Sequence, residues 1–96
     1  MWQVGDHYNK HGRGMGYSSK IEYDAAAKKF ATEMQTHPDT KIFEGQWNGR
    51  GQLNGTTQRA IINNGKTVII DSNSGKIIDF FEGTDISEII NQTQLK

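Results

Sequence analysis

The hydrophobic pattern of this chain changes its period at Pro38, and this change limits the possible folds more than any other feature. Before Pro38, apolar residues recur at three- and four-residue spacing, which is typical of a helix buried on one side. After it, short apolar runs are separated by Asn, Ser and Gly, which is typical of strands joined by tight turns. We therefore expect an α+β fold with N-terminal helices packed on an antiparallel sheet.

The main helix is predicted over Ser19–Thr36. Ser19 and Glu22 have the spacing of a capping box at its start. Pro38 bounds its end, because the residue before a proline avoids helical geometry. One apolar stripe follows from this spacing, made of Ile21, Tyr23, Ala26, Ala27, Phe30, Ala31 and Met34.

About four strands are predicted in the second half of the chain, at Lys41–Trp47, Arg59–Asn63, Lys66–Asp71 and Lys76–Phe81. The pair Asn64-Gly65 between two apolar runs predicts a hairpin, because these residues tolerate the positive φ angles of a two-residue turn. Asp85 and Glu88 repeat the capping-box spacing among three isoleucines, which predicts a short C-terminal helix.

Composition excludes several classes of protein. The 96 residues, of which 33% are apolar, suit a single domain over residues 1–96 with a small core. The absence of cysteine excludes a disulfide framework, thiolate zinc sites and cysteine nucleophiles. No apolar run exceeds three residues and no secretory signal is visible, so we expect no membrane anchoring in this domain. The net charge of zero argues against nonspecific coating of nucleic acid.

A short helical turn is predicted near the start of the chain. Asp6 is a good N-cap, and Gly12 can supply the left-handed residue that ends the turn. His7 and His11 are four residues apart, so within such a turn they share one face.

Two imidazoles on one face suit the cleavage of RNA by its own 2′-hydroxyl group. This reaction needs a base for the hydroxyl, an acid for the leaving 5′-oxygen and positive charge on the phosphate. Histidine serves the first two tasks because its pKa of about 6.5 populates both forms near neutrality. Lys10 and Arg13 are the neighbouring cations for the third. His7, Lys10 and His11 are therefore candidate catalytic residues, with Arg13 as a phosphate ligand.

Two other interpretations of the same residues remain open. The histidines and Lys10 near a chain start are also compatible with a solvated surface. The spacing of His7 and His11 would also place two nitrogens on one side of a helix for zinc. No third ligand is evident beyond His37 or a carboxylate, so we predict no metal and no other cofactor.

A second group of candidates lies in the predicted sheet. Trp47 followed by a loop that carries Arg50 could stack on a base and contact its edge. Arg59 could bind a phosphate and Thr67 could donate a hydrogen bond to one. The alternatives are a core tryptophan with a polar loop, and the exposed face of a half-covered sheet.

Several motifs together resemble the toxin domains at the C-termini of bacterial polymorphic toxins, above all those of contact-dependent growth inhibition systems. The first is His7-x-x-Lys10-His11-Gly12, followed by Gly16-Tyr17-x-Ser19-x-x-Glu22-Tyr23 and an alanine-rich helix. Weaker similarity continues through Phe43-x-Gly45, the Asn48–Gln52 loop and the Gly75–Ile78 strand. The resemblance covers about residues 5–83.

This resemblance implies a metal-independent ribonuclease of the barnase/EndoU/colicin/RelE superfamily. Many members attack tRNA, are delivered into neighbouring bacteria and are neutralised by a cognate immunity protein, and some engage elongation factor Tu. The motif implies that His7, Lys10 and His11 lie in the site. Relatives often have a threonine or serine where this chain has Asp79, so Thr67 is the nearest substitute for a third catalytic residue.

The function predicted from sequence is thus a tRNA-cleaving endoribonuclease toxin that leaves a 2′,3′-cyclic phosphate. It would be part of a secreted or cell-surface effector and act in the cytoplasm of the target bacterium. The alternative is a non-catalytic protein-binding or adaptor module, for which the histidine cluster would have no use. A metal-dependent nuclease is a third reading, which sensitivity to chelators would reveal.

Overall fold

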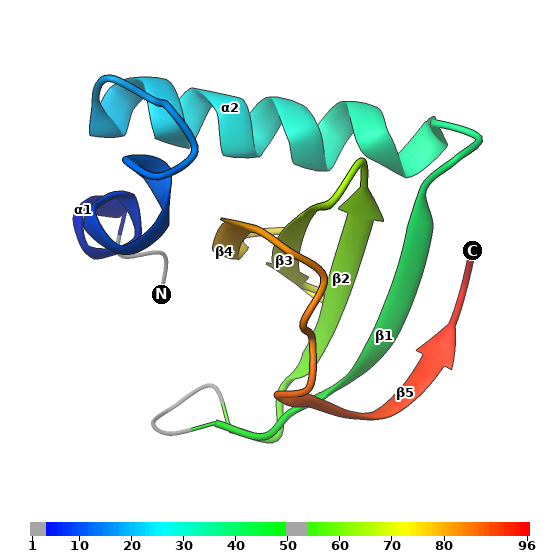
Figure 1. Cartoon of the computed structure of the whole chain (residues 1–96). Helices are drawn as coiled ribbons and strands as arrows, with labels where there is room; N and C mark the ends of the chain where they lie inside the picture. The colour runs from blue at the N-terminus through cyan, green and yellow to red at the C-terminus, as the bar shows by residue number, and fades with distance from the viewer. Residues whose placement is uncertain (1–3, 50–53) are drawn as a thin grey trace.

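The computed structural model describes residues 4–49 and 54–96, which form an antiparallel sheet with the long helix across one face and the N-terminal helical segments beside one edge (Figure 1). The helical segments are α1 (Val4–His7), the π-helical turn η1 (Tyr8–Gly12), α2 (Lys20–Glu33) and the 3-10 turn η2 (Met34–Thr36). The strands are β1 (Lys41–Trp47), β2 (Thr57–Asn63), β3 (Lys66–Asp71), β4 (Ile77–Glu82) and β5 (Ile89–Gln94). The predicted α+β class is confirmed. No helix in the described part of the chain is long and apolar enough to cross a membrane.

Helix α2 begins where the capping signal predicts. The backbone N–H of Glu22 donates to the Ser19 hydroxyl at 3.1 Å, which satisfies one of the unpaired donors of the first turn. Tyr23, Ala27 and Ala31 are buried at four-residue spacing and face the sheet. Ile21, which we expected in this stripe, is 78% exposed and lies outside it.

The predicted hairpin at Asn64-Gly65 forms, and the sheet has the strand order β4-β3-β2-β1-β5. Between β2 and β3, Asn64 and Gly65 have φ angles of +51° and +73°. Positive φ at both central positions is the geometry that matches the twist of two antiparallel strands. The signal is local to the turn, which is why sequence alone could identify it.

The predicted C-terminal helix is wrong: the segment forms strand β5, which pairs antiparallel with β1. The Asp85 carboxylate accepts from the backbone N–H of Ser87 at 3.0 Å, so it closes a local turn instead of capping a helix. As strand β5, the segment buries Ile89 and forms backbone hydrogen bonds with the outer edge of β1. The sheet therefore has five strands instead of the predicted four.

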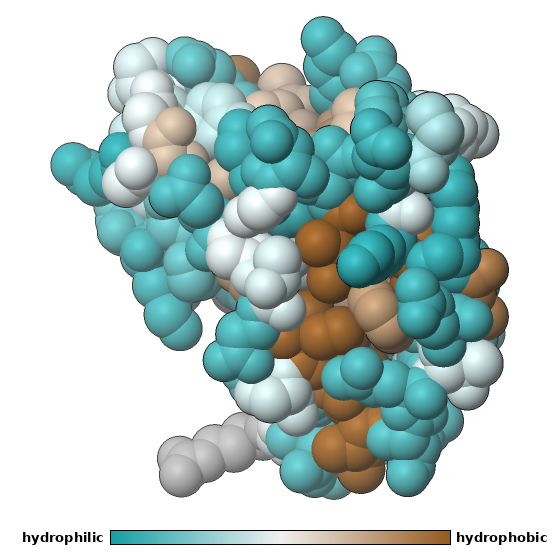
Figure 2. Space-filling view, turned by 45° about the vertical axis from the view of Figure 1, so that its right-hand side comes forward, coloured by the Kyte–Doolittle hydropathy of each residue, from teal (hydrophilic) through white to brown (hydrophobic). Residues whose placement is uncertain are grey.

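Both faces of the sheet carry apolar side chains, but helix α2 packs on only one of them. Ile61, Val68 and Phe80 belong to the core beneath α2. Ala60 and Ile69 belong to a second cluster on the opposite face, which we call the open face. The chain between β4 and β5 crosses the open face (Figure 1). The space-filling view shows a band of apolar surface between polar side chains (Figure 2). Chemistry that needs solvent access therefore has room on the open face.

The turn before α2 differs from the prediction in two details. Helix α1 begins at Val4, so Asp6 lies inside it instead of capping it. Gly12 is buried in the π-helical turn, whereas the left-handed glycine is Gly16, with a φ of +92°. Gly12 is required for close packing: a Cβ there would lie 2.6 Å from the Tyr8 ring and 2.8 Å from the Tyr23 ring.

We expect Gly12→Ala to lower the free energy of unfolding by about 1–3 kcal/mol, because the added methyl group overpacks the buried ring of Tyr23 and the partly buried ring of Tyr8. Gly14→Ala is the matched control, since its Cβ would be 3.6 Å from the nearest atom, the His11 carbonyl oxygen. Its effect should stay within about 0.5 kcal/mol. Urea denaturation measures both, and equal effects of the two variants would contradict this account of the turn.

Candidate functional site

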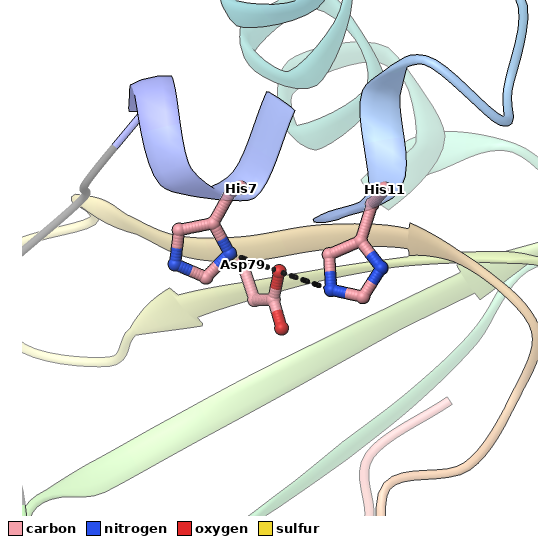
Figure 3. Close-up of side chains that lie close together, drawn as sticks. All are labelled: His7, His11 and Asp79. Carbon is pink, nitrogen blue, oxygen red and sulfur yellow. Dashed lines mark hydrogen bonds and ion pairs between the residues drawn. The ribbon is translucent and has the colours of Figure 1, made fainter. Parts of the chain in front are cut away.

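His7 and His11 converge on one carboxylate, that of Asp79 in β4 (Figure 3). The Nδ1 atom of His7 lies 2.7 Å from Asp79 Oδ1, and the Nε2 atom of His11 lies 3.7 Å from the same oxygen. The two imidazole rings are 6.1 Å apart between centroids. Residues that are 72 positions apart in the chain thus form one cluster.

The π-helical turn places both histidines on the side that faces the sheet. Its wide turn is closed by the backbone N–H of Arg13, which donates to the Tyr8 carbonyl oxygen at 3.0 Å, five residues back. Such turns are rare and occur frequently at functional sites. Side chains four residues apart remain on one side of this turn, so the shared face predicted for His7 and His11 is present (Figure 3).

A bulge in β4 sets the position of Asp79. Ile70 of β3 pairs with Ile77, whereas its neighbour Ile69 pairs with Asp79. Ile78 is therefore an extra residue in β4. Because Asp79 lies opposite Ile69, it shares the open face with the second apolar cluster. The bulge therefore turns the Asp79 carboxylate toward the histidines.

The contact with Asp79 determines the tautomer of His7. An ionised carboxylate only accepts hydrogen bonds, so the ring must donate its Nδ1–H to Asp79. The Nε2 atom is then the nitrogen that can exchange a proton with a substrate. Asp79 Oδ1 also accepts from the backbone N–H of Phe80 at 2.8 Å, which holds the carboxylate in place. This histidine with its orienting carboxylate is an arrangement used in acid–base catalysis.

His11 sits in a more apolar environment. Its ring packs against Phe81 at 5.7 Å between centroids. Burial lowers the pKa of His11 below its usual value, Lys10 and His7 lower it further, and the Asp79 carboxylate opposes them. His11 is therefore mostly neutral near pH 7, the form that can accept a proton.

A hollow of about 220 Å³ opens beside the cluster on the open face. His11 and Asp79 line one part of it, and the aromatic rings of Trp47 and Phe81 also line it. Two further carboxylates, those of Asp85 and Glu88, belong to the same lining. The hollow thus joins the proton-transfer groups to a surface suited to a flat ring with N–H donors.

Of the predicted binding and catalytic residues, Lys10 and Trp47 line the hollow, whereas Arg13 contacts other residues of the turn. Lys10 is exposed and lines the same hollow as His11. Arg13 is exposed, and its guanidinium lies 5.3 Å from the centroid of the Tyr8 ring and donates to Asn9 at 3.2 Å. Trp47 is half-buried and lines the hollow.

Two residues predicted in the sheet lie elsewhere or are enclosed. Arg59 is on the face opposite to Asp79, because it pairs with Ile70, and its guanidinium binds the Glu44 carboxylate at 2.7 Å. Thr67 is fully buried, and its hydroxyl donates to the Gly83 carbonyl oxygen at 2.7 Å. The structure thus gives Arg59 and Thr67 structural partners and places neither with the histidines. Arg50 lies outside the described residues.

Asp79 is the site residue that the sequence argument did not select. It appeared there as a departure from the threonine or serine of similar toxins, and Thr67 was named in its place. The signal was present, because a carboxylate inside the run Ile77-Ile78-Asp79-Phe80-Phe81 is costly to place in a sheet without a partner.

Comparisons of the chain with protein-family models, curated proteins and solved structures found no match. The likeness to toxin domains therefore remains a prediction from the motifs alone.

The charges around His11 give a test by titration. Lys10→Ala should raise the pKa of His11, because it removes a repelling positive charge, and Asp79→Asn should lower it, because it removes an attracting negative one. Lys29→Ala removes an exposed lysine of α2 as a matched control and should leave the pKa unchanged. NMR titration of the His11 ring measures all three, and a fall in the Lys10→Ala variant would refute the assignment.

Proposed function

We propose that this protein is a metal-independent endoribonuclease that cleaves RNA by attack of the 2′-hydroxyl group. The observation that carries the proposal is the convergence of two imidazoles on the Asp79 carboxylate beside an aromatic-lined hollow. This is the pairing of proton acceptor and proton donor that the reaction needs, with a place for the substrate next to it.

In the proposed mechanism, His11 is the base and His7 is the acid. The lowered pKa of His11 suits it to take the proton of the 2′-hydroxyl, whose oxygen then attacks the phosphorus. The bond between phosphorus and the 5′-oxygen breaks, and that oxygen takes the Nε2 proton of the protonated His7 ring. The Nδ1 proton stays on His7, hydrogen-bonded to Asp79. Lys10 lies beside the developing charge. The products are a 2′,3′-cyclic phosphate and a 5′-hydroxyl end.

The hollow would hold a base of the RNA next to the scissile phosphate. Trp47 and Phe81 offer faces for stacking, which stabilises binding of any base. Asp85 and Glu88 accept hydrogen bonds, so they favour a base that presents amino or imino N–H groups. These contacts fit an enzyme that selects its RNA in preference to degrading all RNA.

The biological setting of the proposal comes from the resemblance to toxin domains. By similarity, the substrate is tRNA, a cognate immunity protein neutralises the enzyme, and elongation factor Tu assists its action. The domain would belong to a secreted or cell-surface effector and cleave RNA in the cytoplasm of the target bacterium.

The first test replaces each histidine and measures the cleavage of total cellular RNA in the presence of a chelator. His7→Ala and His11→Ala should each reduce the rate by at least about 100-fold, the usual contribution of a general acid or base. His37→Ala is the matched control and should keep full activity. Its ring lies in the turn after α2, where it accepts from the backbone N–H of Asp39 at 3.1 Å.

Two outcomes would contradict the proposal. One is cleavage at the wild-type rate in both variants. The other is a folded wild-type protein that cuts no RNA and is harmless when expressed without an inhibitor, which would favour a protein-binding module.

Asp79 is a positioning residue in this mechanism, and its replacement should change the pH profile as well as the rate. Asp79→Asn should lower kcat/KM by at least about tenfold, because an amide no longer selects the Nδ1–H tautomer of His7. The acidic limb of kcat/KM should move to lower pH, because the base His11 loses an attracting negative charge. Rates measured from pH 4.5 to 8.5 decide this, and a reduced rate with an unmoved limb would indicate a purely structural role.

A further inference from the structure

The cluster of His7, His11 and Asp79 has the composition and spacing of a metal site. Within the described residues, these three offer ligand atoms that all lie within 4.8 Å of one another. The distances from Asp79 Oδ1 are 2.7 Å to His7 Nδ1 and 3.7 Å to His11 Nε2. A tetrahedral zinc ion with bonds of about 2.0–2.1 Å keeps its ligand atoms roughly 3.3 Å apart. The observed separations lie on either side of that value, so shifts of roughly half an ångström suffice for these two pairs.

We propose that His7, His11 and Asp79 bind Zn²⁺, and that the bound ion inhibits the ribonuclease. From the sequence, no third zinc ligand was evident beyond His37 or a carboxylate, and the fold brings the carboxylate of Asp79 to the two histidines. Two imidazole nitrogens and one carboxylate oxygen are a ligand set that zinc accepts, with the fourth position open to water. The binding follows from the ligand geometry alone, whereas the inhibition rests on the proposed function.

The charges around the cluster favour a cation. Asp79, Asp85 and Glu88 line the same hollow, and among its described lining residues Lys10 is the one lysine or arginine. Within the described residues, three carboxylates near one ammonium group leave an excess of negative charge, which attracts a divalent ion. Asp85 and Glu88 are not ligands of the cluster, and their charges add to the ligand geometry.

The ion also has a route to the cluster and a support behind it. The side chains of His7 and His11 are each 23% exposed, and that of Asp79 is 19% exposed, so the ligand atoms can be reached from solvent. The backbone N–H of Phe80 donates to Asp79 Oδ1 and holds the carboxylate in place. Hydrogen bonds of this kind to a ligand strengthen metal sites.

Zinc and proton transfer would compete for the same nitrogens. A metal ligand must be deprotonated, so binding would displace the Nδ1 proton of His7 and occupy Nε2 of His11. Neither ring could then serve as base or acid in the proposed mechanism. Zinc should therefore inhibit cleavage, and a chelator should restore it, whereas a chelator abolishes the activity of a metal-dependent nuclease.

The binding test uses Zn²⁺ and the purified chain in isothermal titration calorimetry, without RNA. Wild-type protein should bind one ion. His7→Ala, His11→Ala and Asp79→Asn should each weaken binding by at least about tenfold, since even outer-shell changes at metal sites have effects of that size. His37→Ala is the matched control and should bind as wild type does. Circular dichroism confirms that each variant is folded.

A measurement on the wild-type protein keeps the test decisive if a variant does not fold. Addition of Zn²⁺ should shift the ring-nitrogen NMR signals of His7 and His11 and leave those of His37 unchanged. Absence of binding, equal binding by the folded variants, or shifts centred on His37 would each overturn the site.

RNA cleavage supplies the last measurement. Zn²⁺ should inhibit wild-type cleavage over the same concentration range in which it binds. Binding at the cluster without inhibition would overturn the inhibitory role while leaving the site. Stimulation by zinc would overturn both that role and the metal-independent mechanism. Binding with inhibition, together with cleavage in chelator, supports the whole proposal.

Discussion

The side chain of Tyr23 is the contact on which the rest of the structure depends. It is fully buried, and its hydroxyl donates to the backbone carbonyl oxygen of Phe80 in β4. Burial raises its pKa, so the hydroxyl remains protonated and continues to donate at any physiological pH. Its ring lies 6.0 Å from Tyr8 and 5.6 Å from Phe80 between centroids, and Gly12 packs against it. One residue of α2 thus joins the π-helical turn to the edge strand that carries the site.

This arrangement explains why the chemistry lies at the edge of the sheet. An edge strand has a free side against which another segment can pack, and a bulge there can redirect one side chain without disturbing the core. In β4 the redirected side chain is Asp79, and the segment beside it brings His7 and His11. The cluster can serve proton transfer or hold a cation, because both uses need nitrogen and oxygen atoms a few ångströms apart in a partly buried place. Which use prevails depends on whether a proton or a metal ion occupies the nitrogens.

Sequence reasoning succeeded where the determining physics is local. The capping of α2 by Ser19 and the turn at Asn64-Gly65 each involve a few consecutive residues, and both were predictable. It failed at Asp85, where an acidic residue before isoleucines resembled a helix start. The outer edge of β1 offered hydrogen bonds to that segment, and at Gly45 a Cβ would collide with the Ile90 carbonyl. Strand β1 lies far from this segment in the sequence, so the local pattern of residues could not predict that the segment becomes β5.

By itself, the sequence determined the α+β class, the main helix, the hairpins and the nearness of two histidines, because periodicity, capping and turn chemistry act over a few residues. Only the tertiary structure decided that His7 meets Asp79, that Arg59 is bound to Glu44 on the other face, and that the chain ends in a strand. These contacts join residues far apart in the chain. They follow from which face of the sheet each side chain occupies, and a single bulge in β4 is enough to alter that assignment.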